Sequence, residues 1–178
     1  DQDRAGGIAD PFPTSYRPLT LATIIKGGRL KLDIAVEIAR RLLRGLSKLH
    51  ELDLLHRDVK PSNIVFVNRH PKLADIGILT ADQGPAKVIG TPKYMPPDRV
   101  IDKTADVYAM GVVLREMIES VPAQSADQVA EPTHWDMERL DAVIARACAP
   151  RSADRFQSAA AMLDELEASR FEGTLLFE

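Results

Sequence analysis

Residues 56–63 read HRDVKPSN. This stretch places Asp58, Lys60 and Asn63 at a spacing that suits the handling of a hydroxyl nucleophile, a phosphate and a metal ion together. An acid that could bind a second metal ion, Asp75, follows in KLADIG at residues 72–77. An aspartate and an asparagine in an isolated loop usually cap turns. The combination of all four residues favours phosphate and metal chemistry over that alternative.

Length and composition limit the classes of protein to which the chain can belong. A chain of 178 residues is long enough for one domain with a core and short for two. Its net charge of −3 and lack of a basic run give no indication of a nucleic-acid partner. No stretch approaches the roughly 20 apolar residues of a membrane span, and the single Cys148 fits a reducing compartment. We expect a cytoplasmic protein, or the cytoplasmic domain of a membrane-anchored one, with Cys148 as a small buried helix residue.

Apolar residues predict several helices. A stripe recurring every three or four residues indicates a helix from about residue 33 to 50, and an almost wholly apolar segment indicates a central helix at 104–119. Further helices are expected at 137–148 and 158–169, and Thr20 could cap a short one at 21–26. The stripe of the first long helix consists of Ile34, Ile38, Leu42, Leu46 and Leu49.

Short strands and loops separate these helices. Leu54-Leu55 and residues 64–67 are short apolar runs that suggest strands, and residues 72–74 could pair with the second run. The glycines and prolines of residues 77–98 predict a long irregular excursion, and such loops are usually functional. We therefore expect a mainly α fold with a few short strands. Residues 1–18 suggest a linker or hinge remnant, residues 19–170 the domain, and residues 171–178 a tail.

HRDVKPSN resembles the catalytic loop of eukaryotic-like (Hanks-type) Ser/Thr protein kinases. Further stretches match this family in order, and the similarity runs from about residue 19 to 168. It implies the C-terminal lobe of a kinase, a helical bundle with short strands around the catalytic loop, which transfers a phosphoryl group from ATP to protein Ser/Thr hydroxyls. The further stretches are ADIG at 74–77 (the metal-binding DFG motif), GTPKYMPPD at 90–98 (ending in APE), ADVYAMG at 105–111 (the central helix) and ADRF at 153–156 (the late arginine motif).

The resemblance implies roles in the transfer itself. Asp58 would accept the proton of the substrate hydroxyl or orient that hydroxyl, and Lys60 would sit over the transferring phosphate. Asn63 and Asp75 would supply hard oxygen ligands for the magnesium carried by ATP. Ser62 and Val65 are implied to contact the nucleotide, with Val65 beneath adenine.

Other positions would support this site. The resemblance implies that Thr91 hydrogen-bonds towards Asp58 and Lys60 and fixes the substrate platform, as in Ser/Thr kinases. It makes His56 a packing residue and Asp106 a brace for the loop backbone. Arg57 has two open interpretations, a receiver for a phosphorylated activation loop or a salt bridge to a nearby carboxylate. Between residues 77 and 90 the only hydroxyl is that of Thr80, badly placed for the usual phosphosite.

The chain departs from the family pattern. It contains no G-x-G-x-x-G loop and no V-A-I-K-like lysine, and it begins with Asp1 and not methionine. We therefore expect an excerpt or processed product whose N-lobe is supplied upstream, inactive alone and without tight ATP or Mg²⁺ binding. Ile76 replaces the phenylalanine of DFG. Asp98 replaces the glutamate of APE, so that its ion pair with Arg155 is expected to be strained or bridged by water. The substrate-docking helix between residues 120 and 135 is expected to be shortened or missing.

The sequence is compatible with two functions. The first is a Ser/Thr protein kinase acting on protein substrates as part of a longer protein. The second is a pseudokinase or regulatory module that binds partner proteins without transfer. In either case we expect apolar surface where the N-lobe belongs, around Ile64, Val65, Phe66 and Ile76, and self-association through it.

Overall fold

The computed structural model describes residues 18–28, 30–76, 91–120 and 135–170, and within these ranges the chain is mainly helical. This confirms the predicted fold class. Short 3₁₀ turns at Pro61–Asn63, Pro92–Tyr94 and Ser152–Asp154 connect the longer elements. In chain order the helices and strands are α1 (Leu21–Lys26), α2 (Leu32–Glu51), β1 (Ile64–Val67), β2 (His70–Leu73), α3 (Lys103–Glu119), α4 (Met137–Ala147) and α5 (Ala159–Ala168).

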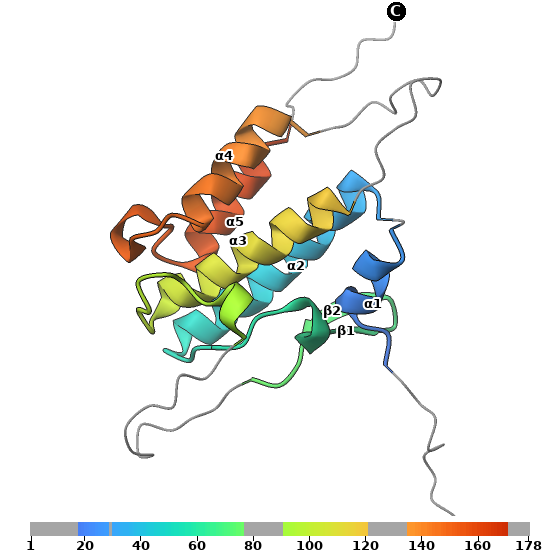
Figure 1. Ribbon diagram of the computed structural model, residues 1–178, viewed down its shortest axis with the longest axis horizontal. Coiled ribbons are helices and arrows are strands. Elements are labelled where there is room, and N and C mark those ends of the chain that lie inside the picture. Colours follow the sequence, from blue (N-terminus) through green and yellow to red (C-terminus); the bar gives the residue numbers. More distant parts are fainter. Residues whose placement is uncertain (1–17, 29, 77–90, 121–134, 171–178) are drawn as a thin grey trace, which may run out of the picture.

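Two long helices, α2 and α3, lie side by side at the centre of the molecule (Figure 1). Helices α4 and α5 pack against one side of this pair, while α1 and the β1–β2 hairpin lie near the other. Helix α3 is buried on most of its faces, as its apolar sequence predicts. Its fully buried side chains are Val107, Met110, Val113, Leu114 and Met117.

The helix boundaries follow from capping side chains. The Thr20 hydroxyl accepts a hydrogen bond from the Thr23 N–H at 3.3 Å and begins α1, as predicted. Asp102 caps α3 through the Thr104 N–H at 2.7 Å, and Asp136 and Ser158 cap α4 and α5. The predicted bounds of all these helices are confirmed to within one or two residues. Cys148, predicted to be buried within a helix, is instead the half-buried residue that ends α4, and burial raises the pKa of its thiol.

Two details of the predicted helix and strand pattern are wrong. Ile34 is 51% exposed, because successive i, i+4 steps drift by about 40° around a helix and the first buried residues of α2 are Ala35 and Val36. Leu54-Leu55 is no strand. The Leu54 N–H donates to the Leu49 carbonyl at 2.9 Å, so this backbone closes the end of α2 instead of pairing with a strand.

The β1–β2 hairpin connects two parts of the predicted site. Ile64 pairs with Leu73 and Val67 with His70, in an antiparallel register. The intervening residues Asn68 and Arg69 both have positive φ, as a tight hairpin turn of this hand requires. Beyond the paired strands, the Ala74 N–H donates to the carbonyl of Asn63 at 2.8 Å, which confirms the predicted pairing of residues 72–74.

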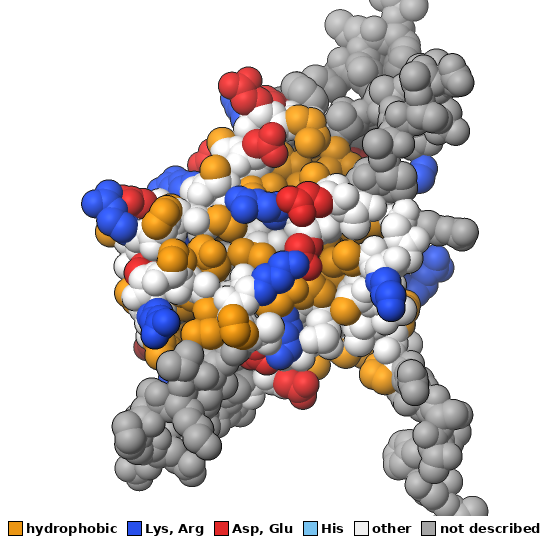
Figure 2. All heavy atoms as spheres, in the orientation of Figure 1, with side chains coloured by type: hydrophobic (Ala, Val, Ile, Leu, Met, Phe, Trp, Pro, Cys, Tyr) orange, Lys and Arg blue, Asp and Glu red, His pale blue; other side chains and the backbone are white. Residues whose placement is uncertain are grey.

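The predicted apolar patch is smaller than expected. Ile64 is fully buried because it points into the core from the start of β1. The prediction that Ile64 belongs to the exposed apolar patch is therefore wrong. Val65 and Phe66 are half-buried, while Ile76 is 38% exposed. The face seen in Figure 2 carries scattered acidic and basic side chains with no large area of one sign. Within the described ranges, no helix has the length and apolar character of a membrane span.

Several predictions lie outside the described residues. They are the linker at residues 1–17, Thr80 in the glycine-rich excursion, most of the interval predicted to lack a docking helix, and the tail at residues 171–178.

Candidate active site

The loop at residues 56–63 is held by α3. The carboxylate of Asp106 accepts the backbone N–H of His56 at 2.9 Å and that of Arg57 at 2.8 Å. The Nε2 atom of His50 lies 3.0 Å from the same carboxylate. Asp106 is 2% exposed, so these contacts are shielded from water. The buried carboxylate of Asp106 therefore fixes the loop backbone to the central helix.

Asp58 is the centre of a group of polar side chains. The amide Nδ2 of Asn63 donates to Asp58 Oδ2 at 2.8 Å and to the Asp58 carbonyl at 3.1 Å. The Lys60 Nζ lies 2.6 Å from Asp58 Oδ2 and donates to the Thr91 hydroxyl at 3.0 Å. The Thr91 hydroxyl in turn donates to Asp58 Oδ1 at 3.5 Å. Four of the predicted site residues, from the loop and from the segment after residue 90, are therefore brought together.

Asn63 and Asp75 are the residues that could hold a metal ion. Asn63 is buried and directs its amide nitrogen to Asp58, and in the described part of the chain no hydrogen bond uses its Oδ1. Asp75 directly follows Ala74, whose N–H is bonded to the Asn63 carbonyl, and its exposed side chain makes no hydrogen bond or ion pair with a described residue. Its φ of 56° is a left-handed conformation that costs free energy for a residue with a Cβ.

These two side chains fit a magnesium ion that arrives with a nucleotide. Magnesium usually takes one or two protein oxygens and completes its shell with phosphate and water. Among the described residues, no three His, Cys, Asp or Glu side chains are grouped so as to hold a metal ion. The donor set is therefore suited to an ion shared with phosphate oxygens, and unsuited to one held by protein alone.

The remaining predicted residues surround this group. Ser62 is exposed in the 3₁₀ turn, and Val65 is half-buried in β1, where it forms a bridge with Thr20. His56 is fully buried, and its ring nitrogens find no hydrogen-bond partner among the described residues. Burial lowers the pKa of His56 against the opposing effect of Asp106 and Asp58, which favours a neutral packing residue. Arg57 is half-buried, with a φ of 66°.

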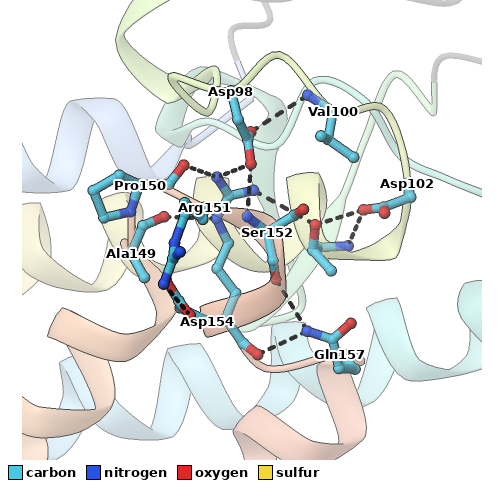
Figure 3. Close-up of polar contacts among 11 residues, drawn as sticks. Asp98, Val100, Asp102, Ala149, Pro150, Arg151, Ser152, Asp154 and Gln157 are labelled. Carbon is cyan, nitrogen blue, oxygen red and sulfur yellow. Dashed lines mark hydrogen bonds and ion pairs between the residues drawn. The ribbon is translucent and has the colours of Figure 1, made fainter.

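Asp98 and Arg155 form a direct ion pair. Figure 3 shows the polar contacts around Asp98. The Arg155 Nη2 lies 2.8 Å from Asp98 Oδ2, so the contact is direct and the predicted water bridge is wrong. The guanidinium of Arg155 also donates to the carbonyls of Ala149 and Pro150, both at 2.8 Å, and is buried. These carbonyls hold the arginine where the shorter acid reaches it, and the missing methylene leaves no gap.

Backbone groups complete the surroundings of Asp98. The Ser152 N–H donates to Asp98 Oδ2 at 2.6 Å and the Val100 N–H to Oδ1 at 3.3 Å. Desolvation acts to raise the pKa of Asp98, but the contact with Arg155 and the hydrogen bonds from Val100 and Ser152 outweigh it and lower the pKa below its usual value. The pair ties the segment that follows Thr91 to the region just before α5.

Sequence reasoning missed a second polar group beside the site. A cavity of about 410 Å³ borders Lys60 and Thr91 and reaches Glu116 of α3. The Glu116 carboxylate accepts a hydrogen bond from the Tyr94 hydroxyl at 3.2 Å and lies 2.7 Å from the Lys93 Nζ. A signal was present in the sequence, since Glu116 is an acid between the buried residues Leu114 and Met117 of the central helix.

Comparisons with known proteins identify relatives of this chain. The protein kinase domain family matches residues 15–168. The serine/threonine-protein kinase PknL of Mycobacterium tuberculosis is 29% identical over 197 residues, which cover 90% of this chain and 49% of PknL. The serine/threonine-protein kinase PknB of Mycolicibacterium smegmatis is 33% identical over 159 residues, covering 74% of this chain and 25% of PknB.

A solved structure is similar as well. The crystal structure of the Mycobacterium tuberculosis PknI kinase domain superposes with a TM-score of 0.63 and 26% sequence identity. The match covers 85% of this chain and 62% of that kinase domain. Among the curated relatives, the chain spans about half the length of PknL and a quarter of that of PknB.

Proposed function

This chain belongs to the protein kinase family, and we propose that it provides the acceptor and metal side of an active site that phosphorylates protein serine and threonine hydroxyls. The relatives PknL and PknB carry the name serine/threonine-protein kinase, which supports the substrate class. The observation that carries the proposal is the mutual bonding of Asp58, Lys60, Asn63 and Thr91.

Asp58 would receive or orient the acceptor hydroxyl. Its Oδ2 is engaged by Asn63 and Lys60, whereas among the described residues Oδ1 has only the long contact to Thr91. That less occupied oxygen is the one available to a substrate hydroxyl. The interactions of the other oxygen hold the carboxylate in a single orientation, which reduces the entropy that must be lost when the substrate is positioned.

Lys60 and Thr91 would hold the other side of the acceptor. The ammonium of Lys60 lies between Asp58 and the Thr91 hydroxyl, so its charge is fixed beside the place where the hydroxyl would react. A fixed positive charge stabilises the negative charge of a transferring phosphoryl group. Thr91 links the segment after residue 90 to the loop, and the hydroxyl at this position supports a serine or threonine acceptor.

Magnesium and ATP complete the proposed reaction. When bound, Mg²⁺ neutralises phosphate charge and orients the nucleotide. Asn63 Oδ1 and the Asp75 carboxylate would hold the ion, with Ser62 near the phosphates and Val65 beneath adenine. The 178 residues contain no glycine-rich loop or V-A-I-K-like lysine, so we propose that a separate N-lobe supplies those contacts.

The proposal also covers the extent of the domain and the behaviour of the isolated chain. We propose that residues 19–170 form the C-lobe, that its substrates are proteins, and that it lies in the cytoplasm, either as a free protein or as the cytoplasmic domain of a membrane-anchored kinase. The chain alone would lack activity because only one wall of the nucleotide site is present and water would reach the phosphates. Leu19, Val67 and Ile76 are exposed apolar residues around β1, and self-association of the isolated chain would occur there.

Phosphate transfer by the complete protein tests this function. The substitution Asp58→Asn keeps the shape of the side chain and removes its basicity, and transfer from labelled Mg–ATP to a serine substrate should fall about 1,000-fold. Asp53→Asn is a matched control, because Asp53 is an exposed aspartate that contacts Lys103 outside the site. Undiminished transfer by Asp58→Asn would contradict the proposed role. A wild-type protein that binds a partner but transfers no phosphate would instead be a pseudokinase.

A further inference from the structure

The cavity beside Lys60 lies next to Asp58, the residue proposed to receive the substrate hydroxyl. Lys60 and Thr91 line it, and both contact Asp58. Tyr94, another lining residue, lies one 3₁₀ turn beyond Thr91, and its N–H donates to the Thr91 carbonyl at 2.9 Å. An extended peptide advances by about 3.3 Å per residue. A peptide whose hydroxyl reaches Asp58 therefore passes this cavity within a few residues of the acceptor.

More of the cavity surface is apolar than polar, and its charged lining residues are Lys26, Lys60 and the acid Glu116 of α3. Ile25 of α1, Pro61 and Tyr94 also line the space. The side chain of Glu116 is 15% exposed, so its charge needs a partner within the protein.

Lys93 and Tyr94 provide those partners. The Lys93 Nζ lies 2.7 Å from Glu116 Oε1, in an ion pair that does not reach the alignment of a hydrogen bond. The Tyr94 hydroxyl donates to Oε2 at 3.2 Å. Burial and the neighbouring Glu116 both raise the pKa of Tyr94, so its hydroxyl remains a donor. The Lys93 side chain is 61% exposed, whereas the acid it neutralises is not.

We propose that this cavity binds the side chain of a substrate residue near the acceptor, and that Lys93 makes it prefer an uncharged side chain over arginine or lysine. The inference rests on the proposed function. An entering guanidinium would have to displace Lys93 from Glu116 while lying close to Lys60. An apolar side chain would instead pack against Ile25, Pro61 and Tyr94 and leave the ion pair intact.

The same reasoning predicts the effect of removing the lysine. Without the Lys93 charge, the poorly exposed carboxylate of Glu116 would lack its cation, and a substrate arginine would restore the pair. Lys93→Met removes the ammonium and keeps most of the side-chain length. Glu116→Gln keeps the shape of the acid and removes its charge, so the double variant should have no site for an arginine.

Peptide phosphorylation by the complete protein tests the inference. The peptides share one serine and carry leucine or arginine at a single position, from three residues before the serine to three after it. The ratio of kcat/KM for the leucine peptide to that for the arginine peptide is measured at each position. Wild-type protein should favour leucine at one position. Lys93→Met should shift the ratio there towards arginine by about threefold to tenfold, as expected for one partly buried ion pair.

Two further variants separate specificity from structural damage. The double variant Lys93→Met, Glu116→Gln should lose the shift towards arginine. Lys103→Met, which removes a different surface lysine that contacts Asp53, should leave the wild-type ratio unchanged. An unchanged ratio in Lys93→Met, or a wild-type preference for arginine at the position that responds, would overturn the inference.

Equilibrium binding distinguishes failure of the subsite from failure of the proposed function. The same peptides, with alanine in place of serine and a fluorescent label, are titrated with the complete protein. A shift in the binding ratio without phosphate transfer by wild-type protein would refute the proposed function and keep the subsite. Phosphate transfer with no shift in either ratio would refute the subsite alone.

Discussion

Asp106 accepts a hydrogen bond from the backbone N–H of His56 over 2.9 Å, although 50 positions separate the two residues in the sequence. The same carboxylate accepts the N–H of Arg57. Both donors belong to the loop that carries Asp58. The position of the proposed base therefore depends on one buried carboxylate of the central helix.

Removal of this carboxylate should destabilise the chain. Asp106→Ala would leave buried backbone donors without acceptors, and we expect it to lower the free energy of unfolding by about 3 kcal/mol. Urea unfolding of the 178-residue chain measures this value. Asp141→Ala is the control, because Asp141 is exposed on α4, and it should change the stability by less than about 0.5 kcal/mol. Equal stability of the two variants would show that Asp106 does not brace the loop.

Restoring the glutamate of the family at position 98 should destabilise the chain. Asp98 already lies 2.8 Å from Arg155 and also accepts the N–H groups of Ser152 and Val100. Asp98→Glu adds a methylene that these close contacts do not accommodate, and we expect a loss of about 1 kcal/mol in urea unfolding. A gain in stability would mean that the native pair is strained after all.

The same pair predicts a dependence of stability on pH. Because the folded-state pKa of Asp98 is lowered, its contribution is present above the unfolded-state value of 3.8 and is lost as the pH falls through the folded-state value. Wild-type stability should therefore decrease below about pH 4, and Asp98→Asn should show a smaller decrease over that range. Parallel curves for the two proteins between pH 5 and pH 2 would contradict the lowered pKa.

Two glycines should respond in opposite ways to alanine. A Cβ at Gly111 of α3 would lie 2.7 Å from the Ala147 Cβ and 2.9 Å from the Cys148 Sγ, so Gly111→Ala should destabilise the chain by about 1–3 kcal/mol. Among the described residues, and apart from the backbone of α2 itself, the nearest atom to a Cβ at Gly45 would be 3.9 Å away, and Gly45→Ala should stabilise the chain by about 0.5–1 kcal/mol. Thermal unfolding of both variants provides the comparison. A stabilising Gly111→Ala would show that α3 and α4 are less closely packed than described.

Thr91 provides a test of the substrate platform. Thr91→Val keeps the shape of the side chain but removes the hydroxyl between Lys60 and Asp58, and kcat of the complete protein should fall about tenfold to a hundredfold. Thr91→Ser keeps a hydroxyl and should retain most of the activity. If Thr91→Val were as active as Thr91→Ser, the hydroxyl would have no positioning role.

Local patterns in the sequence predicted most of the fold. The apolar period of α2, the apolar character of α3 and the capping residue Thr20 are short-range signals, and the helices they predict are present. The errors arose where tertiary contacts decide. Ile34 follows the helical stripe, yet none of the described elements buries it, and Ile64 is buried by the packing of the start of β1.

The site was only partly predictable for the same reason. The spacing within residues 56–63 indicated which side chains could act, because the loop itself keeps them close. The direct Asp98–Arg155 pair depends on carbonyls of Ala149 and Pro150, and no sequence pattern gives their positions. The contact between Lys93 and Glu116 likewise joins a loop to a distant helix.

The most direct test of the central claim is a crystal structure of the complete protein with Mn²⁺ and a non-hydrolysable ATP analogue, in which anomalous scattering locates the metal. We predict that Asn63 Oδ1 and the Asp75 carboxylate lie at about 2.0–2.3 Å from the ion, as direct oxygen ligands to such cations do. The Asp58 carboxylate should face the terminal phosphate without binding the metal. A metal bound away from both Asn63 and Asp75 would contradict the account.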